Sequence, residues 1–461
     1  MNPGPFFGAV PLSLSPQPRA RLKILFVGDL HLGVLPGHLP AESRLDAHSL
    51  SPAAAWQRVV AAARKHAVHA VALAGDLVDG RNDLFEAFGP LEEGLRSLDV
   101  AGIPVVAVAG NHDTRVLPRL AEMLDGLHLL GPGGTWSSFI VSGPAGLEAR
   151  LTGWSFPRAH VETSPLTTPP PAADPRRPTL GLLHADLDQT ASRYAPVSTA
   201  ELQRTGYRAW FLGHTHRPDT PNTDGRPFYL GSVVGLHPGE TGEHGPVLVE
   251  MDGAGRLEAR RLPLAPLRWE QLDVAVDREF DPAYEEFLPQ LLEAVRQRGA
   301  ELGPALDETL AVGFRLRLKG ETQAAPRVRG NLARLETDEP SLVLDQGRTV
   351  LFIDRIEADL ALPLDLADLA RFPDPAGLLA RRLLILAGQD GNVPGCDNPA
   401  AERERLLLAA EEKLAAVDAL GAFRGLGEAP AREDVRQHLL AAGQRALEEI
   451  LIHREAPHAA G

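Results

Sequence analysis

The sequence predicts an α/β fold whose polar loops gather along one edge of its sheets. Short apolar runs alternate with longer segments in which apolar residues recur at helical spacing. Residues 51–65 illustrate the helices, because Ser51 is a favourable N-cap and Pro52 suits the first helical position. This rhythm of strand, polar loop and helix is typical of layered α/β domains. Strands are expected near residues 22–27, 67–73, 104–108, 127–130, 138–141, 149–151, 179–183, 209–212, 228–230 and 245–250, and a second helix near 84–98.

Length, charge and cysteine content narrow the class of protein. A chain of 461 residues is expected to form two or three domains. Its net charge of −15 argues against a simple basic coat for nucleic acid, although a locally positive groove or bound divalent ions can offset that charge. The single cysteine excludes an intrachain disulfide framework and fits a reducing compartment, so we expect a cytoplasmic protein.

Changes in composition divide the chain into four parts. Residues 1–20 contain several prolines and no basic leader, so they are expected to form a flexible tail and not a signal peptide. Residues 21–265 form the main α/β part, which includes a proline-rich surface loop at 157–178. Residues 266–360 suggest a smaller α+β domain, and residues 361–461 a helical region. No apolar run is long enough to span a bilayer, so no membrane partner is expected.

Polar side chains follow five of the expected strands, at the point where each strand ends. Ligands of α/β sheets bind outside the carboxyl ends of the strands, so these side chains are expected to converge. Taken singly, each could be a turn or capping residue. Together they supply imidazole, carboxylate and amide ligands without a thiolate, which suits Mn²⁺, Fe or Zn²⁺, and they are numerous enough for two ions. The residues are Asp29, His31, Asp76, Asp79, Asn111, His112, His184, His214 and His216.

These motifs resemble those of the calcineurin-like metallophosphoesterases. The segments that carry the resemblance read GDLH, GDLVD, GNHD, LLHAD and GHTH, and they cover about residues 22–250. The resemblance implies a four-layered α/β/β/α sandwich with a dinuclear metal centre. It implies that one metal is held by Asp29, His31, Asp76 and His216, and the other by Asp76, Asn111, His184 and His214, with Asp76 bridging. It also implies that His112 is catalytic and not a metal ligand.

The chemistry expected of such a centre follows from charge. Two cations lower the pKa of a water molecule and bind the oxygens of an otherwise unreactive phosphodiester. His112, whose charge can change near neutral pH, can donate a proton to the departing alkoxide. By analogy with related phosphatases, Asp79 is expected to orient His112, and the alternative is a turn or capping residue. Asp113 is expected to be structural.

The fold cannot choose between phosphatases, nucleotide phosphodiesterases and nucleases. Later segments resemble the bacterial SbcD-type and YhaO-type DNA-repair nucleases, which implies a smaller α+β capping domain and Mn²⁺-dependent exonuclease or endonuclease activity. The alternative is a phosphodiesterase or phosphatase acting on nucleotides or phosphoproteins. A silent scaffold is a third interpretation, against which the complete ligand set argues. The segments that carry the nuclease resemblance are 229–242, 264–269, 313–320 and 372–381.

A stripe of basic residues in the predicted capping domain is the candidate DNA contact. Arg315, Arg317 and Lys319 alternate onto one face of an expected strand, and Arg327 and Arg329 lie nearby in the sequence. Contacts from these residues to phosphates would make DNA affinity fall with rising salt. The alternative is an ordinary solvated strand face.

The remaining expectations concern partners and rest on the same resemblance. In those nuclease families the protein works with an SMC-like coiled-coil ATPase, which a C-terminal helical segment grips. Residues 402–453 are expected to form a helical hairpin that could play this part, or that could instead pack on the protein's own cap. A homodimer through helices near the start of the nuclease domain is also implied.

Overall fold

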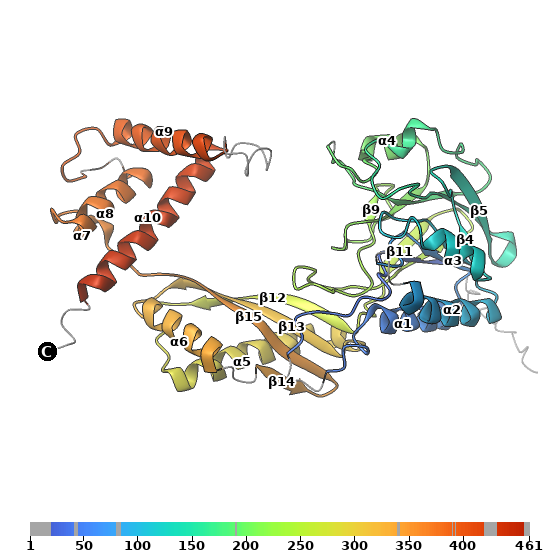
Figure 1. Ribbon diagram of the computed structural model, residues 1–461, viewed down its shortest axis with the longest axis horizontal. Coiled ribbons are helices and arrows are strands. Elements are labelled where there is room, and N and C mark those ends of the chain that lie inside the picture. Colours follow the sequence, from blue (N-terminus) through green and yellow to red (C-terminus); the bar gives the residue numbers. More distant parts are fainter. Residues whose placement is uncertain are drawn as a thin grey trace, which may run out of the picture. The chain divides into compact units, whose positions relative to one another are not determined.

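The structure is a computed structural model (Figure 1), which describes residues 20–40, 45–79, 84–189, 191–338, 342–389, 391, 393–418 and 431–455. The predicted N-terminal tail therefore lies outside the described residues, except for residue 20. The chain forms two compact units, which are described separately. The first comprises Met1–Leu272, Leu292–Arg315 and Ser341–Arg355, and the second comprises Asp273–Leu291, Leu316–Pro340 and Ile356–Gly461.

The first unit contains a six-stranded sheet with the strand order β11-β10-β1-β2-β3-β4. Strands β1 to β4 run parallel, so the carboxyl ends of β1, β2 and β3 share one edge, whereas β10 and β11 are antiparallel additions. The bounds are Leu22–Val27 for β1, Ala70–Leu73 for β2, Val105–Ala107 for β3, Leu127–Leu129 for β4, Val247–Met251 for β10 and Leu257–Arg261 for β11.

A five-stranded sheet in the same unit has the order β5-β6-β7-β8-β9. Strands β6 to β9 run parallel, and β5 pairs antiparallel with β6. The carboxyl ends of β7 and β8 therefore meet at one edge. The bounds are Trp136–Ser142 for β5, Glu148–Trp154 for β6, Thr179–His184 for β7, Ala209–Gly213 for β8 and Phe228–Tyr229 for β9.

The two sheets pack face to face between outer layers, which confirms the predicted α/β/β/α sandwich. Phe26 of β1 stacks on Phe211 of β8 in the apolar core between the sheets, with ring centroids 3.6 Å apart. Apolar residues of α1, α2 and α3, including the fully buried Trp56, cover the outer face of the six-stranded sheet. Leu202 of α4 helps to cover the other sheet. The helices are α1 (Pro52–Lys65), α2 (Leu84–Val100), α3 (Leu117–Met123) and α4 (Thr199–Arg204), and short 3₁₀ turns span Pro144–Gly146, Pro165–Thr167 and Gly303–Leu306.

The proline-rich loop is more closely packed than a simple surface excursion. The Tyr207 hydroxyl donates to the carbonyl oxygen of Pro171 (2.6 Å), and the Trp136 indole donates to that of Thr168 (2.9 Å). Leu166 and Ala173 lie against the buried ring of Trp210 and its neighbours. The loop therefore completes the outer layer of the five-stranded sheet.

A third sheet, with the order β12-β13-β15-β14, forms the predicted α+β part together with α5 and α6. The boundary between the two compact units falls within each of its three long strands, β12, β13 and β15. The domain boundaries that the sequence predicts, at 265/266 and 360/361, therefore remain a prediction. The bounds are Leu267–Val276 for β12, Ala311–Glu321 for β13, Val343–Gln346 for β14, Thr349–Ala361 for β15, Tyr284–Leu302 for α5 and Ala325–Asp338 for α6.

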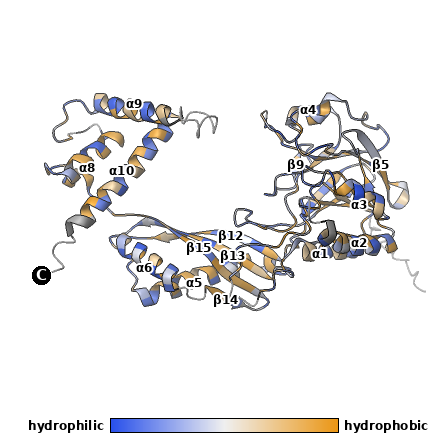
Figure 2. Ribbon diagram, in the orientation of Figure 1, coloured by the Kyte–Doolittle hydropathy of each residue, from blue (hydrophilic) through white to orange (hydrophobic). Residues whose placement is uncertain are grey.

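The second unit ends in helices α7 (Leu366–Leu369), α8 (Pro375–Leu386), α9 (Pro399–Asp418) and α10 (Arg432–Glu455). Helices α9 and α10 correspond to the two predicted helical patterns, and hydrophobic and hydrophilic residues are interspersed along both (Figure 2). Leu447 of α10 is buried in a cluster with Leu383 of α8, and Gly443 lies against the same leucine. Part of the apolar surface of α10 is thus covered by the chain itself. No helix among the described residues is long and apolar enough to cross a bilayer.

Candidate metal centre

The predicted metal-site residues all lie where strands of the first unit end. Asp29 and His31 follow β1, Asp76 and Asp79 follow β2, Asn111 and His112 follow β3, His184 ends β7, and His214 and His216 follow β8. The backbone nitrogen of His31 donates to the carbonyl oxygen of Asp76 (3.0 Å), and that of His214 donates to the carboxylate of Asp29 (3.0 Å). These bonds join loops that are far apart in the sequence, and they bring both sheets' loops to one place.

One group of potential ligands consists of Asp29, His31 and His216. The Nε2 atoms of the two histidines lie only 2.9 Å apart, and Asp29 and His31 are almost completely buried. The Nδ1–H of His216 donates to Oε1 of Glu240 (2.9 Å), which leaves Nε2 of this ring as the nitrogen with a free lone pair. Two imidazole nitrogens and a carboxylate that face one point are a suitable ligand set for a divalent ion.

The second group consists of Asp76, His184 and His214, with Asn111 beside them. The Nδ1–H of His184 donates to the carbonyl oxygen of Ala74 (3.0 Å), so in a neutral ring Nε2 can only accept. Yet Nε2 faces two further acceptors, Oδ1 of Asn111 at 3.0 Å and Oδ2 of Asp76 at 3.2 Å. With a neutral ring these acceptors converge without a donor, and a bound cation would give each lone pair a partner.

The electrostatics of the second group point the same way. Burial lowers the pKa of His184, but the negative charge of Asp76 and its hydrogen bond outweigh burial and raise that pKa to about 9. In His214, burial and the charge of His184 lower the pKa instead. The pocket around Asp76 therefore favours positive charge, which a divalent ion would supply without protonating its ligands.

The backbone at the site adopts conformations that are uncommon for side chains with a Cβ. His31, Asp76 and His214 have positive φ angles of 48°, 49° and 98°. Such conformations cost free energy and are concentrated at functional sites. At Gly110, a Cβ would collide with Oδ1 of Asp76, so only glycine allows this close approach of the β3 loop.

His112 and Asp79 lie together beside the first ligand group. Oδ1 of Asp79 is 2.7 Å from Nδ1 of His112, and both side chains are partly exposed. Asp79 is farther from His31, at 3.8 Å from its Nδ1. This geometry suits a carboxylate that orients His112, which is one of the two roles that the sequence allows for Asp79.

Asp113 ties the loops after β2 and β3 together. Its completely buried carboxylate accepts hydrogen bonds from the backbone nitrogens of Leu77 (2.8 Å) and Gly110 (2.7 Å). Burial and the nearby charge of Asp76 raise the pKa of Asp113 to about 7. These contacts agree with the structural part expected for it.

Two carboxylates that contact the metal-site histidines were missed by sequence reasoning. Asp186 lies 3.2 Å from Nε2 of His214, and Glu240 accepts from His216. Asp186 stands two residues after His184 in the LLHAD motif, so its position next to a ligand was a usable signal. Glu240 follows His216 by 24 residues, and only the folded chain brings the two side chains together.

The structure pairs every residue of the predicted basic stripe with a carboxylate. On β13 the alternation is present, because Arg315, Arg317 and Lys319 are partly exposed while Leu316 and Leu318 between them are buried. The pairs are Arg315–Asp354 (2.8 Å), Arg317–Glu357 (4.0 Å), Lys319–Asp273 (2.7 Å), Arg329–Glu448 (3.1 Å) and Arg327–Asp281. Their positive charge is therefore largely compensated, and contact with DNA would require these pairs to open or to share their arginines.

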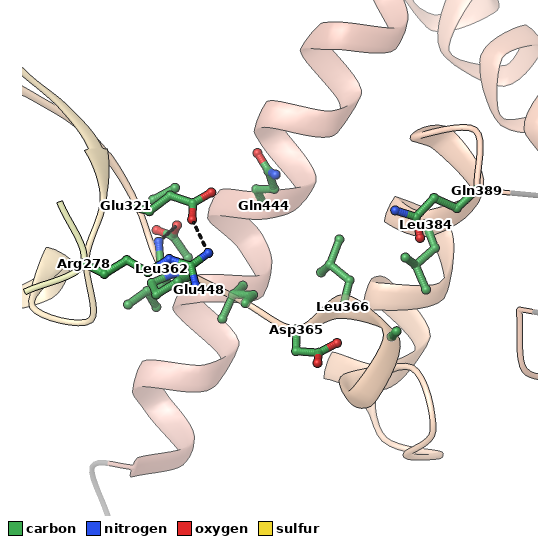
Figure 3. A pocket seen from close by; sticks show the side chains of 13 residues that line it. Arg278, Glu321, Leu362, Asp365, Leu366, Leu384, Gln389, Gln444 and Glu448 are labelled. Carbon is green, nitrogen blue, oxygen red and sulfur yellow. Dashed lines mark hydrogen bonds and ion pairs between the residues drawn. The ribbon is translucent and has the colours of Figure 1, made fainter. Parts of the chain in front are cut away.

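A separate cavity of about 480 Å³ lies in the second unit, between the ends of the cap strands and α8 and α10 (Figure 3). Arg278 and Glu321 form an ion pair of 3.1 Å at one side of it, and Glu448 lies close by. None of the predicted metal-site residues lines this cavity.

Comparison with known proteins identifies phosphoesterases among the relatives of this chain. Residues 22–218 match the family of calcineurin-like phosphoesterases. A Haloferax volcanii protein named DNA double-strand break repair protein Mre11 is 30% identical over 308 residues, which cover 63% of this chain and 65% of that protein. The uncharacterized metallophosphoesterase YhaO of Bacillus subtilis is 28% identical over 251 residues, which cover 50% of this chain and 57% of YhaO. The chain thus spans less than two thirds of the length of these relatives.

Solved structures show more distant likeness. A Thermus thermophilus protein is 12% identical with a TM-score of 0.30, and a dimetal phosphatase from Danio rerio is 14% identical with a TM-score of 0.33. Each match covers 52% of this chain and 98% of the other protein.

Proposed function

We propose that this chain, whose residues 22–218 form a calcineurin-like metallophosphoesterase domain, cleaves phosphodiester bonds of DNA in DNA repair. The family and the two adjacent ligand groups imply a dinuclear divalent-metal site and a metal-dependent phosphoesterase. The observation that carries the proposal is the convergence of imidazole, carboxylate and amide ligands from five strand ends beside a histidine–carboxylate pair. We propose manganese as the ion, with iron or zinc as alternatives, because imidazole, carboxylate and amide ligands without a thiolate suit all three.

The residues of the site suggest how the reaction proceeds. When bound, the two ions supply positive charge for the phosphate oxygens and activate a water molecule. Asp79 holds Nδ1 of His112, so that Nε2 of the same ring is the nitrogen available to the substrate. A protonated His112 donates its proton to the oxygen of the leaving group, and the Asp79 carboxylate stabilises the charged ring before this transfer.

DNA is proposed as the substrate from likeness to a named DNA-repair protein over 63% of the chain. The loops that follow GHTH and the cap strands are part of the region that resembles DNA-repair nucleases. A phosphodiesterase or phosphatase acting on nucleotides or phosphoproteins is the second candidate. The compensated basic stripe favours it, since each of these five basic residues already has a counterion and attracts a polyanion less strongly.

The proposal includes partners and a location. Helices α9 and α10 are the candidate contact for an SMC-like ATPase, with Leu408 and Leu414 of α9 as exposed apolar residues that such a contact would cover. A homodimer belongs to the proposal by resemblance alone. A cytoplasmic location suits a chain with one cysteine.

A substrate comparison tests the proposal. The purified chain with Mn²⁺ is offered linear duplex DNA, single-stranded DNA, cyclic nucleotides and a phosphoprotein, beside the variant Asp76→Asn as the inactive control. We expect cleavage of DNA that Asp76→Asn lacks. Turnover of the cyclic nucleotides or the phosphoprotein alone would refute the nuclease proposal and favour the second candidate.

A further inference from the structure

Glu240 is held in place by contacts on both of its carboxylate oxygens. Oε1 accepts from Nδ1 of His216 (2.9 Å). Oε2 accepts from the backbone nitrogen of Leu236 (3.0 Å) and the hydroxyl of Ser232 (3.2 Å). The side chain is 15% exposed, so water competes little for these bonds. Because both of its oxygens are held, the Glu240 carboxylate can bind the His216 ring in only one orientation.

The loop that carries Glu240, residues 235–244, is itself anchored to β12, the first strand of the third sheet. The indole of Trp269 in β12 donates to the carbonyl oxygen of Gly235 (3.0 Å), and the nitrogen of Gly242 donates to that of Trp269 (2.9 Å). The buried ring of His244 lies 3.1 Å from the carbonyl oxygen of Glu240. The position of Glu240 therefore depends on β12 as well as on its own loop.

A neutral imidazole has one N–H, and the partner of that N–H decides which nitrogen remains free for a metal. Because Glu240 takes the Nδ1–H of His216, the free lone pair is on Nε2, which faces Nε2 of His31 across 2.9 Å. Without the carboxylate, the ring would lose both its preferred tautomer and its fixed orientation. The negative charge of Glu240 also makes the ring a stronger ligand.

We propose that Glu240 is a positioning residue for His216, and that the 235–244 loop sets the affinity of the ion held by Asp29, His31 and His216. The inference rests on the proposed metal centre. The second ion is held by His184 and His214, whose outer nitrogens contact Ala74 and Asp186 instead, so it should be independent of Glu240.

Metal binding to the whole chain tests this inference. Mn²⁺ affinity and stoichiometry are measured by equilibrium dialysis for wild type, Glu240→Ala and Glu240→Gln, and the spectrum of bound Mn²⁺ is recorded by electron paramagnetic resonance. Loss of a partner that orients a ligand typically weakens metal binding about 10- to 100-fold. We expect a loss in this range for one of two ions in Glu240→Ala, a smaller loss in Glu240→Gln, and a change from the spectrum of coupled ions to that of an isolated ion.

The matched control is Glu258→Gln, which changes an exposed carboxylate of β11 that pairs with Arg21 and lies outside this loop. It should leave both affinities and the spectrum as in wild type. Unfolding of the metal-free proteins is followed by circular dichroism, so that a weaker affinity in Glu240→Gln at an unchanged unfolding temperature separates positioning from folding. Wild-type binding of two ions together with wild-type affinities in both Glu240 variants would overturn the inference alone. Binding of fewer than two ions by wild type would overturn the metal centre as well.

Discussion

The carboxylate of Asp79 lies 2.7 Å from Nδ1 of His112, beside but outside the two groups of potential metal ligands. In the proposed mechanism such a pair moves a proton without disturbing the metals, because neither residue belongs to those ligand groups. Asp79 would fix one nitrogen of the ring and leave the other for the substrate. Proton transfer and metal binding are therefore assigned to different side chains, and variants can separate the two.

The first prediction concerns this pair. His112→Ala removes the proton donor and should lower kcat by about 100- to 10,000-fold, the usual contribution of general acid–base catalysis. Asp79→Asn keeps the shape of the side chain but loses its charge, so a smaller loss is expected. Neither variant should change the number of ions bound per chain, as measured by metal analysis of the dialysed protein. A vacant metal position in His112→Ala would show that this residue is a ligand.

The second prediction concerns the glycine that allows the β3 loop to approach Asp76. In Gly110→Ala the added methyl group would overlap Oδ1 of Asp76 and force the carboxylate or the loop to move. We expect weaker Mn²⁺ binding, lower activity and a loss of stability of about 1–3 kcal/mol, as is usual for overpacking a tight site. Chemical denaturation and metal titration measure these effects.

Gly330→Ala is the control for this substitution. Gly330 lies in α6, where an added Cβ has nothing within 4 Å, so alanine there should be neutral or slightly stabilising. Equal effects of the two substitutions would contradict the packing explanation.

The clustering of the candidate metal ligands could be predicted from the sequence for a local reason. Each motif places a ligand-type residue directly after an apolar run, four of the five with a glycine before it, and parallel strands present such residues at one edge. For Asp29 and His214 the structure shows how closely these ends meet, since the backbone of one bonds the side chain of the other. The strand that precedes each of these two residues is enough to predict where the residue lies.

Residues that act through tertiary neighbours could not be predicted in this way. Glu240 stands in a loop without a strand-end motif, and its contact with His216 depends on how that loop packs on β12. The carboxylate partners of Arg315 and Lys319 come from β15 and β12, so strand alternation alone suggested free charges where the sheet supplies counterions. Alternation predicts which face a side chain occupies, but not what lies across that face.

The fold shows the same division between local and distant causes. Capping at Ser51 was sufficient to predict the start of α1, because the Ser51 hydroxyl accepts from the nitrogen of Ala54. Helix α8 begins with the same kind of cap at Asp374, although from the sequence residues 372–381 are identified only as a segment that resembles nucleases. The packing of α10 on α8 depends on Gly443 and Leu383, which are 60 residues apart, and sequence periodicity contains no information about such pairs.

The third prediction concerns metal removal. A ligand that binds only the folded state stabilises it by about 2.7 kcal/mol when its free concentration is about 100 times its Kd. Without a cation, the acceptors that converge around His184 should destabilise the folded state. Chelation with EDTA is therefore expected to lower the unfolding temperature. Addition of Mn²⁺ should restore it. In Asp76→Asn the shift should shrink, whereas a shift of full size in this variant would place the stabilising ions elsewhere.

The last prediction concerns the basic stripe. If Arg317 and Lys319 contact phosphates, replacing either with alanine should weaken DNA binding and reduce the slope of log affinity against log salt by about one per residue. Turnover of a small phosphodiester should stay unchanged, because neither residue belongs to the groups of potential metal ligands. Arg296→Ala is the control, since Arg296 is an exposed arginine of α5 that pairs with Glu293. Fluorescence anisotropy at several salt concentrations measures the slopes. Identical slopes for wild type and all three variants would mean that the stripe is an internally neutralised strand face, and DNA would then have to be held by the metal centre and its loops.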